Sequence, residues 1–234
     1  MHVLRSLLFY IAFYGGSVFH VLGALIAVHI SPPRVRSFCD AWSAWHHWCT
    51  ENLLGIKIQI TGEMPDGSFL YAIKHEAFFE ALEAPHLFDN PSGFAKQELF
   101  DIPGWGRAAL AYGLIPVARD DGAKALRAML KATRAPIAQG RPLLIYPEGT
   151  RIPHGQHAEL QSGFAALYKM LRLSVIPVAV DSGPNYHRLW KKPGTIRVHF
   201  GEPIPPGLPR QEAEALTLAA INIFNPISQS PPSA

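Results

Sequence analysis

Apolar residues form two kinds of pattern along this chain of 234 residues. Near the start they make one uninterrupted run, "LLFYIAFYGGSVFHVLGALIAVHI" at residues 7–30, which contains no Asp, Glu, Lys or Arg. From residue 56 onward they come in short runs separated by stretches of mixed polarity. Long runs are typical of membrane helices, and short runs between mixed stretches are typical of strands between helices.

The first run is long enough to cross a bilayer core, which takes about 20 apolar residues. A secretory signal peptide is disfavoured, because no small-x-small cleavage site precedes Ser31-Pro32-Pro33. We therefore expect a retained membrane anchor. Gly15-Gly16-Ser17 could divide it into two shorter helices that enter one leaflet, so the sequence leaves spanning and one-sided attachment open.

After the prolines, apolar residues recur every three or four positions through residues 35–53, the period of an amphipathic helix. Its tryptophans suit the headgroup region of a membrane, and they equally suit packing on a protein core. The only cysteines, Cys39 and Cys49, lie here, so we expect no disulfide framework and a reducing compartment. Together with His46 and His47 they fit no zinc-binding spacing, which favours buried thiols.

The rest of the chain predicts a single α/β domain with a largely parallel sheet flanked by helices. In such a fold the loops after the strands form the functional face. The predicted strands are 56–60, 69–73, 114–117, 143–146, 175–180 and 196–200, and the predicted helices are 78–87, 105–112, 123–139, 164–173 and 210–224.

The predicted organisation has three parts. Residues 1–54 hold the membrane-anchoring and amphipathic helices, and residues 55–225 form the α/β domain. The chain ends in "NPISQSPPSA", which looks disordered and dispensable, with residues 226–234 as the tail proper.

Composition supports a membrane environment. Charged residues make up 17% of the chain and hydrophobic residues 48%, whereas a soluble domain carries about 25% charged residues. Some apolar surface is therefore expected to face lipid. A net charge of +3 and a pI near 8.9 suit an approach to anionic lipid or phosphate. No run of basic residues indicates nucleic-acid binding.

The strand at 69–73 is followed by "KHEAFFE", which holds His75 and Glu80. On one helix these two residues would lie about 140° apart, so they meet only if His75 precedes the helix and Glu80 lies in its first turn. The carboxylate would then fix one imidazole nitrogen as a donor and leave the other free to accept a proton. This is the arrangement of a general base with its orienting acid.

The strand at 143–146 ends in "YPEGTR". Pro147 stops the strand and Gly149 permits a tight turn, which exposes backbone amides, the Thr150 hydroxyl and the Arg151 guanidinium together. Such a turn is suited to binding a phosphate. Glu148 would either anchor Arg151 or accept a hydrogen bond from a substrate hydroxyl.

Two more cations, Arg119 in "GLIPVARDDG" and Lys96 in "FAKQEL", are expected on the same edge, which favours a phosphorylated substrate. His154 and His157 form a loop pair without evident carboxylate partners and are expected to be exposed. No Gly-x-Ser-x-Gly motif occurs, so the sequence offers no obvious covalent nucleophile.

Four blocks occur in order: His-x4-acid, Gly-x-Ile-Pro-Val-x-Arg, Pro-Glu-Gly-Thr-Arg and Val-Ile-Pro-Val-Ala-Val. This order resembles the signature of the glycerolipid acyltransferases, specifically the lysophosphatidic acid acyltransferases. With "AKQELFDIPGWGRAALAYGLIPVARD" and "GTIRVHFGEPI", the resemblance covers about residues 70–205. The hydrophobic amino terminus agrees with a family that works on membranes.

The resemblance implies that His75 deprotonates the free hydroxyl of lysophosphatidic acid, which attacks the thioester of acyl-CoA or acyl-carrier protein. Phosphatidic acid would be made by direct transfer, without a metal or another cofactor, at the cytoplasmic side of a bacterial inner membrane. Glu80 would orient His75. The implied acceptor-binding residues are Arg119, Glu148, Gly149, Thr150 and Arg151, to which we add Lys96. The Pro177 block would be a buried strand.

The chain departs from the family pattern Asn-His-x-Ser-x-x-Asp at three positions. Lys74 replaces the Asn, Ala77 the Ser and Glu80 the Asp. The acceptor's identity is the inference that these changes weaken most, and Lys74 could add positive charge beside the acceptor. The alternatives are another lysolipid acceptor, such as lyso-ornithine lipid or a lysophospholipid, a non-catalytic lipid-binding protein of the same fold, and a thioesterase-like hydrolase. The main hypothesis requires His75 and Arg151 to open into a common cavity.

Overall fold

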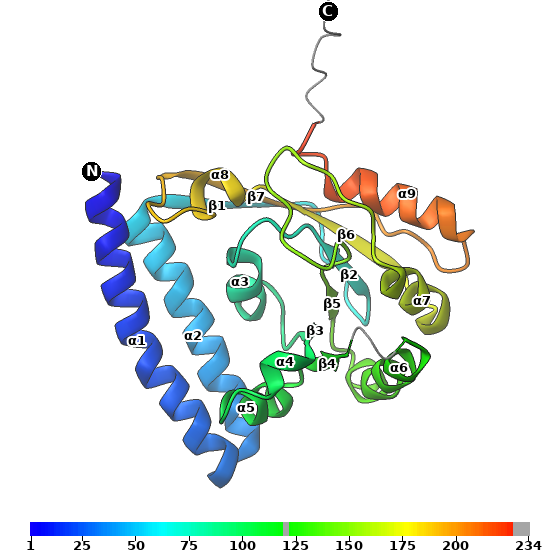
Figure 1. Cartoon of the computed structure of the whole chain (residues 1–234), viewed down its shortest axis with the longest axis horizontal. Helices are drawn as coiled ribbons and strands as arrows, with labels where there is room; N and C mark the ends of the chain where they lie inside the picture. Colours follow the sequence, from blue (N-terminus) through cyan, green and yellow to red (C-terminus); the bar gives the residue numbers. More distant parts are fainter. Residues whose placement is uncertain (119–121, 227–234) are drawn as a thin grey trace, which may run out of the picture.

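The computed structural model describes residues 1–118 and 122–226. A helical hairpin comes first in the chain and a sheet flanked by helices follows (Figure 1). The helical elements are α1 (His2–Ile30), η1 (Pro32–Arg34), α2 (Val35–Cys49), η2 (Thr50–Leu54), α3 (Phe79–Leu87), α4 (Gln97–Phe100), α5 (Trp105–Tyr112), α6 (Gly122–Ala138), α7 (Ser162–Leu171), α8 (Gly183–Tyr186) and α9 (Arg210–Ile221).

The sheet has seven strands in the order β1-β7-β6-β2-β5-β3-β4. All neighbouring pairs are parallel except β6 with β7, so the predicted largely parallel sheet is confirmed. The strands are β1 (Ile56–Thr61), β2 (Leu70–Ile73), β3 (Ser92–Lys96), β4 (Ile115–Val117), β5 (Leu143–Ile145), β6 (Val175–Val180) and β7 (Gly194–Phe200).

The central strands are buried on both faces, as their continuous apolar runs predict. Every residue of β2 and β6 is buried, which confirms the Pro177 block as an interior strand. Alternate residues of β2 serve two cores. Tyr71 and Ile73 pack in the core shared with α1, α2 and α3, while Leu70 and Ala72 pack in the core shared with α6, α7 and α9.

Strand β3 is the strand that the sequence did not predict. Its sequence, "SGFAK", contains a glycine and one large apolar residue, so it carries no strand signal of its own. Pairing with β5 on one side and β4 on the other places it in the sheet. Tertiary context, not local propensity, makes this segment a strand.

Helix α1 is continuous through residues 15–17, so of the two alternatives left open by the sequence the division into two shorter helices does not occur. The glycines instead let α2 approach closely. A Cβ atom on Gly16 would lie 2.2 Å from the indole nitrogen of Trp45, and one on Gly23 would lie 2.3 Å from the Phe38 ring. Figure 1 shows the two helices side by side, remote from α7 and α9.

Helix α1 has a buried side and an exposed side. Ser6, Phe9, Phe13, Ala24 and Ala27 are buried, so both ends of the helix pack on the rest of the protein. The helix is long and apolar enough to cross a membrane, yet only 17% of its most apolar window is buried. The exposed side carries large apolar residues: Leu4, Leu7, Leu8, Ile11, Tyr14, Val18, Phe19, Leu22, Ile26 and Ile30.

The amphipathic segment forms α2, which packs between α1 and α3. Its buried residues include Val35 and Cys49, and Trp45 packs against the core, which confirms the core-packing interpretation for that face. Trp48 is 47% exposed and lies on the outer side. Cys49 is a buried free thiol, as expected, and Cys39 is partly buried.

Candidate active site

Three parallel strands, β2, β5 and β3, lie next to one another and end at the same edge of the sheet. His75 follows β2, the turn from Pro147 to Arg151 follows β5, and Lys96 is the last residue of β3. Parallel strand ends are where α/β folds place ligands. The sheet order therefore brings the predicted residues to one edge, although they come from distant parts of the sequence.

His75 and Glu80 form the predicted pair. His75 lies in the turn before α3, and Glu80 lies in the first turn of that helix. The imidazole Nδ1 is 3.0 Å from Oε2 of Glu80, and the Ala77 amide donates to the same oxygen at 3.0 Å. The carboxylate thus favours a proton on Nδ1, which leaves Nε2 as the acceptor.

The His75 ring also stacks on Tyr146, with 4.3 Å between ring centroids. Burial, and then the nearby charge of Glu80, raise the pKa of Tyr146. The phenol therefore stays neutral and serves as a flat support for the imidazole. Tyr146 lies between the end of β5 and the 147–151 turn, so it links the two halves of the site.

Ser182 completes the surroundings of Glu80 and was missed in the sequence. Its hydroxyl donates a short hydrogen bond to Oε1 of Glu80, and the serine is fully buried. A hydroxyl thus reaches the acid from the segment after β6, while position 77 carries alanine. The contact joins residues 102 positions apart, so no local pattern could have revealed it.

Lys74 and Glu148 form a buried ion pair. Nζ of Lys74 is 2.6 Å from Oε1 of Glu148, and both side chains are fully buried. Two expectations are therefore wrong. Lys74 is not positioned to add charge beside an acceptor, and Glu148 anchors Lys74 rather than Arg151. Oε2 of Glu148 is also 3.5 Å from the His75 amide, so the pair ties the end of β2 to the end of β5.

The structure has the predicted tight turn after β5, but the Gly149 amide, expected to be exposed, is used within the turn. Gly149 has a φ of 73°, a left-handed value that favours glycine, and its amide donates to the Tyr146 carbonyl at 2.9 Å. Thr150 and Arg151 are exposed. The Arg151 guanidinium lies 4.1 Å from the centre of the Phe78 ring, three residues after His75.

Arg151 is thereby brought to the His75 turn. The amide of the following residue, Ile152, donates to the His75 carbonyl at 2.8 Å. Within residues 1–118 and 122–226, no carboxylate lies within ion-pair distance of Arg151. Its donors are available to an anion, and its stacking on Phe78 holds them beside the imidazole.

Only one of the two remaining predicted cations lies among the described residues. Lys96 is exposed at the end of β3, one strand beyond β5 on the same edge. Arg119 lies outside the described residues.

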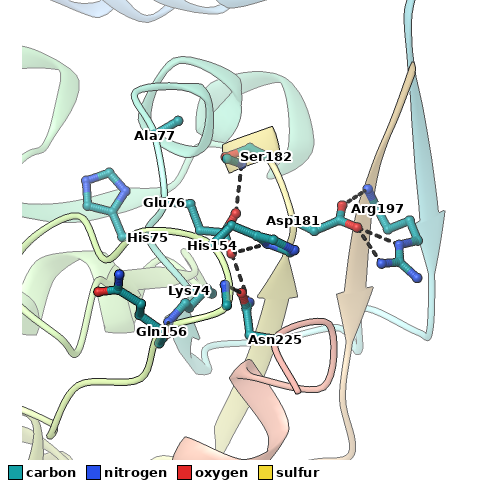
Figure 2. A network of polar contacts seen from close by, with 12 residues as sticks. Lys74, His75, Glu76, Ala77, His154, Gln156, Asp181, Ser182, Arg197 and Asn225 are labelled. Carbon is teal, nitrogen blue, oxygen red and sulfur yellow. Dashed lines mark hydrogen bonds and ion pairs between the residues drawn. The ribbon is translucent and has the colours of Figure 1, made fainter. Parts of the chain in front are cut away.

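A second polar network lies beside the His75 turn (Figure 2). Its centre is Glu76, which is buried and accepts a hydrogen bond from His154 Nδ1 at 3.1 Å and from the Asn225 side chain at 2.9 Å. His157 donates through Nε2 to the Asn225 carbonyl at 2.6 Å. The expectation that His154 lacks a carboxylate partner is wrong. Asn225 begins the stretch "NPISQSPPSA", which looks dispensable in the sequence, but it is fully buried and is the last residue of the predicted domain 55–225.

A third polar cluster joins α2 to α3. Glu83 is fully buried between His46 Nδ1 at 2.5 Å and His47 Nδ1 at 2.9 Å. The other nitrogen of His46 lies 2.7 Å from the Tyr186 hydroxyl. These contacts give the two histidines a structural role as partners of a buried carboxylate.

A hollow of about 830 Å³ lies elsewhere, between α7 and residues 206–210. None of the predicted site residues lines it. The hollow lies beside α7 and not at the His75 turn. We therefore place the candidate site at the strand ends and not in this hollow.

Comparison with known proteins identifies the family. The family model described as Acyltransferase matches residues 56–181. A 1-acyl-sn-glycerol-3-phosphate acyltransferase of Pseudomonas aeruginosa is 29% identical over 210 residues, which cover 86% of this chain and 80% of the relative. An enzyme of the same name from Helicobacter pylori is 31% identical over 135 residues, covering 56% of each chain.

A solved structure shares the fold. The crystal structure of the 1-acyl-sn-glycerophosphate acyltransferase from Thermotoga maritima superposes with a TM-score of 0.67. The match covers 95% of this chain and 97% of that chain at 19% identity. Because 95% of this chain is matched, the superposed region includes the amino-terminal helices as well as the sheet.

Proposed function

The chain belongs to the acyltransferase family, and on this premise we propose that it acylates lysophosphatidic acid to give phosphatidic acid. The donor is a thioester, acyl-CoA or acyl-carrier protein. The observation that carries the proposal is the His75–Glu80 pair at 3.0 Å, on the same edge as an arginine that has no carboxylate partner among the described residues. The names of the relatives support the acceptor.

In the proposed reaction, Nε2 of His75 removes the proton from the acceptor hydroxyl as its oxygen attacks the thioester carbonyl. Glu80, hydrogen-bonded to Nδ1, stabilises the imidazolium that forms. The new C–O bond forms, the C–S bond breaks, and the imidazolium returns its proton to the departing thiolate. Direct transfer is favoured because the buried hydroxyl of Ser182 is engaged by Glu80 and Cys49 is buried in the core.

Arg151 is the proposed phosphate ligand. Its guanidinium offers paired donors that match a phosphate, and its place over Phe78 keeps it near His75. Gly149 and Thr150 are proposed to contribute from the same turn, with Lys96 and Arg119 as further cations. Glu148 is proposed to act indirectly, because its carboxylate is buried against Lys74.

We also propose that α1 attaches the protein to a bacterial inner membrane, with the active site on the cytoplasmic side. Both ends of α1 are packed on the domain, so its exposed apolar side suits a position along one leaflet rather than across the bilayer. The acceptor is itself a lipid, and the free cysteines suit a reducing compartment.

The test is an acyl-transfer assay on protein purified in detergent, with a panel of lysolipids and both donors. We expect the highest kcat/KM with lysophosphatidic acid. His75→Ala should lower kcat by roughly 10²–10⁴-fold, the usual contribution of a general base. Arg151→Ala should raise the KM for phosphate-bearing acceptors. His187→Ala and Arg188→Ala, at exposed positions after α8, are the matched controls.

Each other result has a defined meaning. Full transfer by the His75 variant would reject the proposed base. Equal activity on phosphate-free acceptors, unaffected by Arg151→Ala, would select another lysolipid such as lyso-ornithine lipid. Free fatty acid as the main product would indicate a hydrolase, and inactivity with every acceptor would favour a lipid-binding protein.

A further inference from the structure

The loop between β5 and α7 carries Arg151, and its conformation is held in part from outside. Residues 146–161 contain no helix or strand. The Gln161 amide closes the base of the loop by donating to the Pro147 carbonyl at 2.8 Å, and a turn joins the Gln156 amide to the Pro153 carbonyl at 3.0 Å. Contacts from other segments add to these internal hydrogen bonds.

Besides the contacts of Glu148 with Lys74 and with the His75 amide, two further hydrogen bonds join the loop to the end of β2. The Ile152 amide donates to the His75 carbonyl at 2.8 Å, and Nζ of Lys74 donates to the Gln156 carbonyl at 3.1 Å.

The other contacts come from the far end of the chain. Asn225 follows α9 and is fully buried. Its side-chain oxygen accepts a hydrogen bond from the Gly155 amide at 2.5 Å, and its backbone carbonyl accepts one from His157 at 2.6 Å. Three consecutive residues of the loop, 155–157, are thus held by Asn225 or Lys74.

Glu76 connects Asn225 to the catalytic turn. Its Oε1 accepts from the Asn225 side-chain nitrogen at 2.9 Å and from His154 at 3.1 Å, while its Oε2 accepts from the Gly183 amide at 2.7 Å. Figure 2 shows His154 and Asn225 meeting at this carboxylate, next to His75. Glu76 is 1% exposed and directly follows His75 in the sequence.

We infer that Asn225 is a positioning residue: it clasps residues 154–157 to the His75 turn and so holds Arg151 in the orientation that binds the acceptor's phosphate. The part of this inference that concerns the substrate rests on the proposed function. The part that concerns how Asn225 holds residues 154–157 rests on the contacts above. Asparagine suits this position because one carboxamide both donates to Glu76 and accepts from Gly155. Neither alanine nor an ionised aspartate can do both.

Electrostatics make the donor from Asn225 important. Burial raises the pKa of Glu76, and hydrogen bonds from Gly183, Asn225 and His154 act in the opposite direction. Removing the Asn225 donor leaves a buried carboxylate with fewer partners, which is costly. An ionised aspartate at the same position would add repulsion between two carboxylates.

The experiment compares Asn225→Ala and Asn225→Asp with the control Asn222→Ala. Asn222 lies in the same carboxy-terminal segment and is 4% exposed, but its side-chain nitrogen donates to the Leu218 carbonyl within the end of α9. Two readouts are used. Hydrogen exchange of the peptide covering residues 152–160 shows whether Asn225 holds this loop, and it needs no substrate. Steady-state kinetics with lysophosphatidic acid show whether holding the loop affects substrate binding.

We expect both Asn225 variants to exchange faster in residues 152–160 and to show a KM raised about tenfold, the effect of losing one charge-assisted hydrogen bond. The kcat should change less, because His75 and Glu80 keep their contact. Asn222→Ala should leave both readouts as in the wild type. At lower pH the introduced carboxyl group of Asn225→Asp and Glu76, which faces it beside His154, can share one proton and form a hydrogen bond again. The exchange of this variant should then approach that of the wild type at the same pH.

Unchanged exchange in both Asn225 variants would overturn the inference. So would faster exchange spread over the whole chain with kcat and KM altered together, since that pattern indicates general destabilisation. If Asn225→Ala does not fold, Asn225→Asp decides, because it keeps the size of the side chain and removes the donor to Glu76. Absence of acylation in the wild type would refute the proposed function. The exchange data would still show whether Asn225 holds residues 154–157 in place.

Discussion

The α1–α2 hairpin and the strand-end edge both depart from the usual distribution of polar and apolar residues, in opposite directions. The hairpin exposes large apolar side chains, such as Phe19 at 77% exposed. The edge buries charge, in the Lys74–Glu148 pair and in Glu76. Soluble proteins seldom show either feature without a reason. The two regions differ in what covers the unusual residues: other residues of the protein cover them at the edge, and none of the described residues covers them on the outer side of the hairpin.

The buried charges of the edge find their partners within the protein. In the described ranges the only buried side-chain polar atom without a partner is Oδ1 of Asn222. The outer side of α1 has no such partner in the described part of the chain, and lipid is the partner we propose. Substitutions at the edge should therefore damage folding and catalysis, whereas substitutions on the outer side of α1 should damage membrane attachment alone.

The largest expected effect is that of Lys74→Met. It leaves Glu148 buried without its ion-pair partner, which typically costs about 3–5 kcal/mol. The double variant Lys74→Met with Glu148→Gln should recover much of this loss, because no unpaired charge is then buried. Urea unfolding in detergent, with wild type and both variants compared, measures it. A loss below about 1 kcal/mol in the single variant would show that the edge tolerates unpaired charge.

The next effect concerns the opposite region. Phe19→Ser on the outer side of α1 should weaken binding to vesicles about tenfold or more, since burying one large apolar side chain contributes about 1.5–3 kcal/mol. Thermal stability in detergent should stay unchanged. Leu216→Ser on α9, where the leucine is 45% exposed, is the control and should bind like the wild type. Equal binding by both variants would mean that α1 does not face lipid.

The two regions also differ in how much of them could be predicted from the sequence. The His75–Glu80 pair was predictable because both residues lie within one turn and the start of one helix. The strands were predictable where their apolar runs are continuous, as in β6. The apolar character of α1 was equally evident. These features depend on local sequence, which acts through periodicity and turn chemistry.

Other features depend on contacts between distant positions. Ser182 reaches Glu80 across 102 positions, Asn225 reaches Glu76 across 149, and Lys74 pairs with Glu148 across 74. No spacing rule connects such residues without the fold. The continuity of α1 is a similar case, since Gly16 serves the close approach of Trp45 and does not end the helix.

Ser182→Ala tests whether the buried hydrogen bonds of the edge support catalysis. The change removes the donor to Oε1 of Glu80, so the carboxylate holds the His75 ring less firmly. We expect kcat to fall about tenfold, the value of one hydrogen bond to a charged group, with little change in KM. Ser92→Ala is the control, because this buried serine donates to the Gly113 carbonyl instead. Equal kcat values in the two variants would refute a role for Ser182.

The smallest effect is expected where the two regions meet, at the contact of α2 with α3. The hydrogen bond to Glu83 raises the pKa of His47 against the effect of burial, and the charges of Glu83 and Glu51 add to the increase. The pKa of Glu83 is itself lowered, because hydrogen bonds from His46 and His47 outweigh the effect of its burial. Burial, followed by the charge of His47, lowers the pKa of the neighbouring His86.

These shifts give the pH dependence a definite sign. A histidine whose folded pKa is raised stabilises the fold fully below its unfolded pKa of about 6.5, and the contribution disappears as the pH rises through the folded value. The Glu83 contribution is present above about pH 4.3 and is lost on acidification. The advantage of wild type over His47→Gln should therefore shrink as the pH rises from about 6 towards 9. Melting temperatures measure it, at about 2–4 °C per kcal/mol for a chain of this size. If the difference in melting temperature stays constant over that range, the positive charge of His47 does not contribute to the contact between the hairpin and α3.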